Sequence, residues 1–178
     1  MSNAVDHIGV LVGDLGAAVD HYLDLFRIPR KDVFVERGYR NEVPTGGVQL
    51  LDVAFVKAAN LYFELFQPTS DGPIQDLYLK RGNGVHHVAM RCDDVRDEWR
   101  RHEERRAEFG LIDRIPNVDA NGCSYWFLHP KQNFGVLIEP QAAWVRTSVA
   151  DFTHLEATPD WHKELGVEVS QPNGKGHK

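Results

Sequence analysis

Hydrophobic and polar positions along this chain follow a pattern that occurs twice. Residues 5–26 read VDHIGVLVGDLGAAVDHYLDLF, and residues 85–106 read VHHVAMRCDDVRDEWRRHEERR. Each stretch begins with an apolar run typical of a strand, continues through an aspartate and ends in a segment of helical character. The two stretches are offset by 80 residues, so His7 aligns with His87. The chain therefore contains an internal repeat.

The helix predicted in each repeat begins after an aspartate, Asp14 in the first and Asp94 in the second. An aspartate at this place can accept hydrogen bonds from the free amides of the first helical turn. Steps of four, three and four residues in the first helix predict one buried apolar stripe, formed by Leu15, Val19, Tyr22 and Phe26. The second helix has His102 and Arg106 at the matching places. Its buried face should therefore be narrower.

Three strand-like segments follow each helix and give the order βαβββ twice. We place them at 31–38, 48–56 and 60–67 in the first half, and at 110–115, 123–129 and 134–140 in the second. Sequences rich in proline, glycine and asparagine separate them as turns. The predicted fold class is α+β, with two βαβββ modules that form a half-open eight-stranded barrel around a central site.

The repeat also divides the chain into four parts. Residues 1–67 are the first module, 68–84 a connecting segment, 85–140 the second module and 141–178 a C-terminal tail. The connecting segment should contain a short helix, because apolar residues follow a proline that suits a helix start. The pattern fades in the tail, where we expect one helical turn at 161–165.

Two histidines and two glutamates are prominent within the apolar strands. His7 and His87 occupy equivalent places in the first strand of each module. Glu64 in LYFELF and Glu139 in VLIEP lie in the last strand of each module. A carboxylate buried without a charge partner is strongly unfavourable, so these glutamates need a positive partner. Two imidazoles and two carboxylates suit a divalent ion such as Co²⁺, Mn²⁺, Ni²⁺, Zn²⁺ or Fe²⁺, and the pattern predicts a metal site inside the barrel.

Other polar residues receive structural interpretations. His86 precedes His87, and alternation along a strand should turn it toward the opposite face. His129 in FLHP is interpreted as a turn histidine. The basic cluster at 100–106 is interleaved with glutamates, which is typical of a solvated helix face.

Composition and charge narrow the functional classes. The net charge of −6 leaves no basic surplus for phosphates and argues against a nucleic-acid binder. No apolar run approaches the ~20 residues of a membrane span, and the N-terminus lacks the features of a secretory signal. The two cysteines, Cys92 and Cys123, lie outside any CxxC spacing and favour a reducing compartment. We therefore expect a cytoplasmic protein that acts on a small molecule, without a nucleic-acid or membrane partner.

Four segments carry a family resemblance, and a fifth, EVP at 42–44, carries a weaker one. The four are DHIGVLVGDL at 6–15, PIQDLYLKRGNGVHHVAM at 73–90, CDDV at 92–95 and FLHPKQNFGVLIEP at 127–140. They resemble the vicinal-oxygen-chelate superfamily, which includes glyoxalase I, bleomycin-resistance proteins and extradiol dioxygenases. Within it, the sequence is most similar to methylmalonyl-CoA epimerases. The resemblance implies that the metal ligands are His7, Glu64, His87 and Glu139.

The resemblance further implies a metal-dependent epimerase or isomerase that moves a proton next to a carbonyl group. Methylmalonyl-CoA, an acyl-CoA, is then the first substrate to test. Glu139 is the first candidate for one acid/base role, because a ligand carboxylate can swing away from the metal. We select Glu42 for the second role, with Asp52 as the alternative. A homodimer is expected, since members of the superfamily often dimerise.

Three departures from the epimerases keep other functions open. The loop NVDANGCSYW has Asp119 and Asn121 where epimerases usually have glycine, the turn after HPK differs, and the segment between Val43 and Glu64 is longer. The alternatives are a glyoxalase-type lyase, a ring-cleaving dioxygenase, a sugar-type epimerase of specialised metabolism and a non-catalytic binding or resistance protein. Dependence on oxygen or glutathione would identify the first two. The complete set of four ligands argues against the last.

Overall fold

The computed structural model divides into two compact units. The N-terminal unit is built mainly from Val5–Ala89 and the C-terminal unit mainly from Met90–Thr147. The residues that the structure describes are 4–42, 47–58, 60–118, 124–142, 144–148 and 151–154. Within these ranges, no helix combines the length and the apolar character that a membrane crossing requires.

The N-terminal unit is built around a mixed sheet. Its strands are β1 (Val5–Leu11), β2 (Val33–Glu42), β3 (Val48–Ala58), β4 (Leu61–Pro68) and β5 (Gly84–Cys92). They follow the order β2-β3-β4-β1-β5. Strand β1 runs parallel to β4, whereas β3 is antiparallel to both β2 and β4. The α+β class and the βαβββ order predicted for the first half are confirmed.

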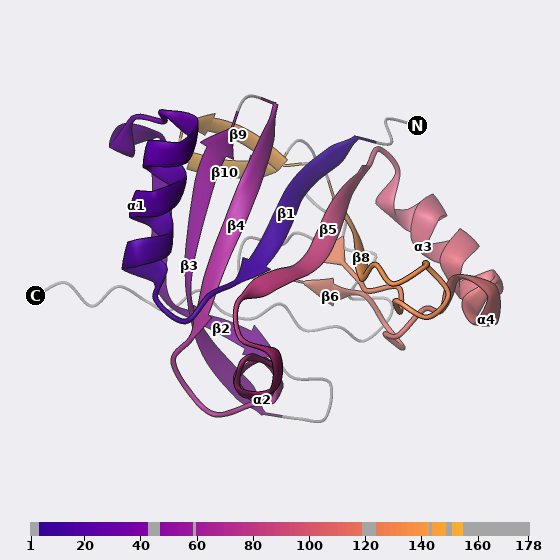
Figure 1. Ribbon diagram of the computed structural model, residues 1–178. Coiled ribbons are helices and arrows are strands. Elements are labelled where there is room, and N and C mark those ends of the chain that lie inside the picture. The colour runs from indigo at the N-terminus through magenta and orange to yellow at the C-terminus, as the bar shows by residue number, and fades with distance from the viewer. Residues whose placement is uncertain are drawn as a thin grey trace, which may run out of the picture. The chain divides into compact units, whose positions relative to one another are not determined.

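Helix α1 (Leu15–Phe26) lies against β3 and β4 (Figure 1). Its start is as predicted, because the side chain of Asp14 accepts a hydrogen bond from an amide of the first turn at 2.9 Å. The predicted apolar stripe is wrong at its last position. Leu23 is buried, whereas Phe26 is 44% exposed and stacks on Phe63. Phe26 is the last residue of the helix, and its ring contacts the partly buried rings of Tyr22 and Phe63 at the edge of the core.

Two shorter elements complete this unit, a 3₁₀ turn η1 (Arg30–Asp32) and helix α2 (Pro73–Arg81). Helix α2 confirms the short helix predicted after a proline in the connecting segment. Ile74 and Leu77 pack on a buried cluster, while Leu79 is exposed. The members of that cluster are Leu11, Leu51, Val53 and Phe66.

The C-terminal unit combines two helices with short strands. The helices are α3 (Val95–Glu104) and α4 (Arg106–Phe109), and the strands are β6 (Asn117–Val118), β7 (Ser124–Tyr125) and β8 (Ile138–Ala142). The strands pair antiparallel in the order β8-β7-β6. Strands β9 (Trp144–Ser148) and β10 (Asp151–His154) form a separate two-stranded sheet. They lie in the predicted tail, and the helical turn expected at 161–165 lies outside the described residues.

The prediction of a strand at 110–115, one of the eight predicted strands, is wrong. Within that range, Leu111 alone forms an isolated bridge. Oδ2 of Asp113 accepts a hydrogen bond from the amide of Phe127 at 2.6 Å. Arg106 donates to the carbonyl oxygens of Leu111 and Asp113 at 3.3 and 2.7 Å. Side chains therefore satisfy backbone groups that a strand would pair with its neighbours.

Helix α3 buries two residues, one fewer than α1, but His102, which was expected to narrow the buried face, is itself buried. Its first turn is capped by Asp94, and Trp99 and His102 are buried. Nε1 of Trp126 donates a hydrogen bond to Nδ1 of His102 at 3.0 Å. A buried polar group loses its hydration, and this bond compensates that loss for both rings.

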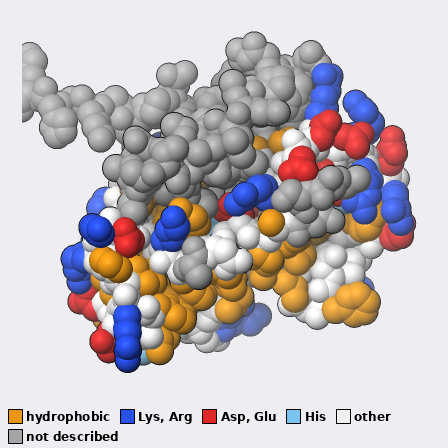
Figure 2. All heavy atoms as spheres, turned by 90° about the horizontal axis from the view of Figure 1, so that it is seen from above, with side chains coloured by type: hydrophobic (Ala, Val, Ile, Leu, Met, Phe, Trp, Pro, Cys, Tyr) orange, Lys and Arg blue, Asp and Glu red, His pale blue; other side chains and the backbone are white. Residues whose placement is uncertain are grey.

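The exposed face of α3 and α4 carries interleaved charges. Figure 2 shows acidic and basic side chains side by side at its right-hand end. Helices α3 and α4 lie on the same side in Figure 1. The ion pairs join Arg100 with Asp97, Arg101 with Glu98, and Arg105 with Glu108. This arrangement agrees with the interpretation of the basic cluster as a solvated helix face.

Candidate functional site

Three adjacent strands of the N-terminal unit, β4, β1 and β5, carry three of the predicted ligands. The parallel register of β1 and β4 places His7 opposite Tyr62 and Gly9 opposite Glu64. Strand β5 lies on the other side of β1 and carries His87. The central strand β1 is thus flanked by one carboxylate and one imidazole.

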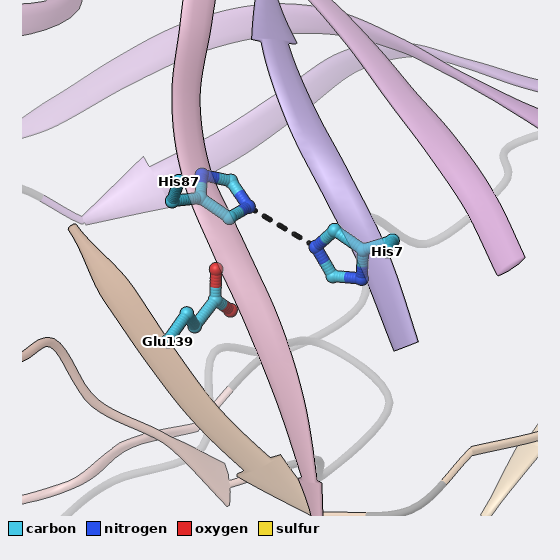
Figure 3. Close-up of side chains that lie close together, drawn as sticks. All are labelled: His7, His87 and Glu139. Atoms are coloured by element: carbon cyan, nitrogen blue, oxygen red, sulfur yellow. Dashed lines mark hydrogen bonds between the residues drawn. The ribbon is translucent and has the colours of Figure 1, made fainter. Parts of the chain in front are cut away.

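The side chains of His7, Glu64 and His87 converge. Nε2 of His7 lies 3.1 Å from Nε2 of His87, and Figure 3 shows these two nitrogens facing each other. Oε2 of Glu64 lies 3.5 Å from Nε2 of His7 and 3.1 Å from Nε2 of His87. Both imidazoles are buried, and the Glu64 side chain is 20% exposed. The fold therefore brings together residues 57 and 80 positions apart in the sequence.

Gly9 provides the space for this convergence. A Cβ atom at this position would lie 2.2 Å from Cε1 of His87 and 2.5 Å from each of its ring nitrogens. Such distances are far below van der Waals contact, so any larger residue at position 9 must displace the imidazole. The absence of a side chain on β1 lets the His87 ring lie over this strand.

Each of the two histidines also has a polar neighbour at Nδ1. Oδ2 of Asp6, which is 1% exposed, lies 3.0 Å from Nδ1 of His7. Nδ1 of His86 lies 2.9 Å from Nδ1 of His87. The prediction that His86 points away from His87 is therefore wrong. Alternation fixes only the direction of Cβ, and the imidazoles extend far enough for their edges to meet.

Burial and charge set the protonation of this cluster. Burial raises the pKa of Glu64, but hydrogen bonds and charge interactions with His7 and His87 outweigh it and hold that pKa below its ordinary value. Burial is the main reason that the pKa of His86 falls to about 3, and the charges of His87 and Arg81 lower it further. At neutral pH, Glu64 is therefore a carboxylate and His86 a neutral imidazole.

The donor set fits a divalent metal ion. A carboxylate accepts hydrogen bonds and donates none, so the contact with Asp6 places the proton of a neutral His7 on Nδ1. Nε2 of His7 then carries a lone pair that faces the carboxylate of Glu64 and the ring of His87. Nitrogen and oxygen atoms this close together need a proton or a metal ion between them, and first-row divalent ions prefer such ligands.

Glu139 belongs to the C-terminal unit, where it lies on β8 and is buried (Figure 3). It influences Asp113, a buried residue that sequence reasoning missed. Burial and the negative charge of Glu139 raise the pKa of Asp113, although hydrogen bonds from Phe127 and Asn117 oppose the increase. Nothing in the sequence around Asp113 distinguishes it from an ordinary loop aspartate.

The two candidates for the second acid/base differ in what surrounds them. Glu42 ends β2, and its side chain lies outside the described residues. Both carboxylate oxygens of Asp52 on β3 accept hydrogen bonds. Oδ2 accepts one from the side chain of Arg37 at 2.5 Å, and Oδ1 accepts one from the backbone amide of Gly38 at 2.9 Å. Burial raises the pKa of Asp52, but the contacts with Arg37 and the amide lower it overall. The altered loop with Asp119 and Asn121 is also outside the described residues.

His129 lies in a turn and is not assigned to the site. Its Nδ1 accepts a hydrogen bond from the amide of Lys131 at 3.0 Å. Its carbonyl oxygen accepts a hydrogen bond from the side chain of Asn133 at 2.9 Å. These contacts confirm the interpretation of His129 as a turn histidine.

The sequence matches a known family over most of its length. The model of the glyoxalase/bleomycin resistance protein/dioxygenase superfamily matches residues 6–127. The chain is 30% identical to the uncharacterized protein YqjC of Bacillus subtilis over 138 residues, which cover 77% of this chain and 90% of YqjC. It is also 30% identical to the ethylmalonyl-CoA/methylmalonyl-CoA epimerase of Cereibacter sphaeroides over 141 residues, or 78% and 97% of the two chains.

Solved structures show the same similarity. A variant of Streptomyces coelicolor methylmalonyl-CoA epimerase, in complex with 2-nitronate-propionyl-CoA, superimposes with a TM-score of 0.58 at 25% identity. The match covers 80% of this chain and 99% of the other. The fold is therefore shared with a protein whose structure holds 2-nitronate-propionyl-CoA.

Proposed function

The chain belongs to the glyoxalase/bleomycin resistance protein/dioxygenase superfamily, and on that premise we propose that it is a divalent-metal-dependent epimerase. Its substrate would be an acyl-CoA with an acidic proton next to the thioester carbonyl. Methylmalonyl-CoA is the first candidate, because the Cereibacter sphaeroides relative is an ethylmalonyl-CoA/methylmalonyl-CoA epimerase.

The convergence of His7, Glu64 and His87 is the observation that supports this proposal most directly. Three donor atoms lie within 3.1 to 3.5 Å of one another on one face of a sheet. Such a cluster of nitrogen and oxygen donors suits a cation. Glu139, the buried carboxylate of β8, is proposed as the fourth ligand.

A divalent ion held by these four residues would supply Lewis-acid stabilisation for the negative charge that develops on the carbonyl oxygen. His7, His87 and Glu64 contribute donor atoms that the sheet holds in place, so the ion would be positioned before the substrate binds. Their burial also excludes water, which strengthens electrostatic interactions at the site.

Inversion at the α-carbon requires two proton-transfer groups on opposite faces of the substrate. One carboxylate removes the α-proton, and a second, protonated group returns a proton to the other face, so the net change is inversion of configuration. We assign these roles to Glu139 and Glu42. Asp52 is a weaker candidate, because both of its oxygens are engaged and its pKa is lowered.

The first experiment measures exchange of the α-proton of methylmalonyl-CoA in D₂O by ¹H NMR. Cobalt-loaded wild-type protein is compared with Glu139→Ala, with His87→Ala and with His21→Ala as a matched control. His21 is an exposed histidine of α1 that lies outside the cluster. Cobalt content is determined for every sample by elemental analysis.

We expect exchange with wild type and His21→Ala, and loss of exchange with the other two variants. His87→Ala should also lose cobalt. If cobalt is bound by the wild type and no exchange occurs, methylmalonyl-CoA epimerisation is excluded. Oxygen uptake and glutathione dependence would then be measured to distinguish a ring-cleaving dioxygenase from a glyoxalase-type lyase.

A further inference from the structure

Asp6 and His86 occupy the same position in the two repeats, 80 residues apart. Each precedes one of the clustered histidines and contacts Nδ1 of that histidine. The Asp6–His7 contact is 3.0 Å long, and the His86–His87 contact is 2.9 Å long. The repeat therefore supplies each imidazole with a partner on the side remote from the cluster, although the two partners differ chemically.

Metal binding through Nε2 depends on these contacts. An imidazole that donates its Nε2 lone pair to an ion must carry its proton on Nδ1. That Nδ1–H group needs an acceptor, since both histidines are buried and an unpaired N–H group is unfavourable there. A histidine whose proton moved to Nε2 would present N–H to the ion and could not bind it.

The two partners meet this requirement in different ways. The carboxylate of Asp6 can only accept, so it holds His7 in a single tautomer. A neutral His86 can accept at Nδ1 only when its own proton is on Nε2. Asp6 can therefore accept the His7 proton in every case, whereas His86 can accept the His87 proton in only one of its two tautomers.

Packing fixes both partners in place. Asp6 is 1% exposed, so its carboxylate is enclosed by the protein. The ring of Phe66 packs against His86 edge to face, with centroids 5.3 Å apart. It also stacks on His87 at 6.1 Å with an interplanar angle of 23°. Phe66 thus holds the two imidazoles in the orientation in which their Nδ1 atoms meet.

We propose that Asp6 and His86 are positioning residues of the metal site: each accepts the Nδ1 proton of the following histidine, so that Nε2 of both His7 and His87 is available to the ion. This inference rests on the metal binding in the proposed function, but it does not depend on the identity of the substrate. Partners of this kind typically contribute about 10- to 100-fold to metal affinity.

The tautomers are measured directly by long-range ¹H–¹⁵N correlation spectra of protein labelled with ¹⁵N-histidine. In chelator-treated wild type, we expect His7 to be protonated on Nδ1. In the Zn²⁺-loaded protein, we expect both His7 and His87 to be protonated on Nδ1. A His7 protonated on Nε2 in either sample would overturn the role of Asp6, and a zinc-loaded His87 without an Nδ1 proton would overturn that of His86.

Metal affinity is measured by calorimetric titration with Zn²⁺. The variants are Asp6→Leu and His86→Phe, with Asp20→Leu and His21→Phe as matched controls on the exposed surface of α1. We expect each site variant to lose about 10- to 100-fold in affinity, whereas the controls retain the wild-type value. His86→Gln should recover part of the loss, because its side-chain oxygen can accept the His87 proton and phenylalanine offers no acceptor.

Circular dichroism shows which variants remain folded. If a variant unfolds, the role of the residue that it replaces is tested by the histidine tautomers measured in the wild-type protein. Unchanged affinity in folded Asp6→Leu and His86→Phe would contradict the inference. If wild type binds Zn²⁺ with the expected tautomers but does not exchange the α-proton, the proposed reaction fails and the positioning role stands. If wild type binds none of the divalent ions, the positioning role fails together with the metal dependence.

Discussion

The imidazole of His87 lies across the backbone of Gly9, where even a methyl group would come within 2.2 Å of Cε1. Gly9 lies on β1 directly opposite Glu64 of β4. The close approach therefore occurs at the centre of the cluster, between two of its members. The local sequence requirement for a glycine on β1 thus comes from a side chain 78 residues away along the chain.

Replacing Gly9 with alanine should displace His87 and weaken metal binding by about tenfold or more, because a misplaced ligand loses its contribution to the site. The overpacked strand should also lose about 1–3 kcal/mol in free energy of unfolding. Zinc titration and urea unfolding measure the two effects. Gly16→Ala is the matched control, since its Cβ would meet its nearest neighbour at an ordinary 3.5 Å. Equal zinc affinity in both variants would refute the steric account.

Protonation of His102 should destabilise the C-terminal unit at mildly acidic pH. Burial, followed by the charges of Arg101 and Arg105, lowers the pKa of His102 to about 4. An unfolded chain binds this proton near pH 6.5, so stability is full above that pH and falls as the pH drops toward 4. The loss should amount to about 2–3 kcal/mol.

Urea unfolding of His102→Leu between pH 7.5 and 4.5 tests this expectation. The variant loses the bond to Trp126 at every pH, but its stability should decrease less steeply on acidification than that of wild type. His21→Leu, which removes an exposed histidine, should retain the wild-type slope. Parallel curves for wild type and His102→Leu would show that His102 does not control the acid response.

The carboxyl group of Asp113 should stabilise the loop before β6 as a hydrogen-bond acceptor rather than as a charge. Its Oδ2 accepts the amide of Phe127 at 2.6 Å, and burial raises its pKa. Asp113→Ala should therefore cost about 1–3 kcal/mol by leaving a buried amide without its partner. Asp113→Asn, which keeps an acceptor oxygen, should cost less. Thermal unfolding of the two variants at pH 7 compares them, and equal losses would favour a role for the charge.

Glu42 and Asp52 should differ in their effect on catalysis. Under the proposed mechanism, Glu42→Gln removes a proton-transfer group and should lower kcat by about 10²- to 10⁴-fold with little change in KM. Asp52→Asn breaks the contact with Arg37 and should affect mainly stability. Coupled assays of methylmalonyl-CoA epimerisation provide kcat for both. A large loss of kcat in Asp52→Asn, with Glu42→Gln active, would reverse the assignment.

The sequence alone predicted most of the N-terminal unit. Apolar periodicity located α1 and the strands that follow it, and Asp14 and Asp94 marked the two helix starts because capping is a local interaction. The equivalence of His7 and His87 came from the repeat. The strand at 110–115 failed, since Arg106 donates to the carbonyl oxygens of Leu111 and Asp113 and the side chain of Asp113 accepts the amide of Phe127, contacts that no local pattern records.

The contacts around the cluster were decided by tertiary structure. The sequence placed Asp6 and His86 at equivalent positions, and alternation along a strand assigned His86 to the wrong side. Only the packed sheet shows its ring held by Phe66 against His87. Periodicity determines which way a Cβ points, whereas the position of a ring depends on rotamers and on the space that neighbouring strands leave, such as the gap at Gly9. The sequence by itself therefore determined the two repeats and the candidate ligands, and the fold decided which atoms of those residues meet.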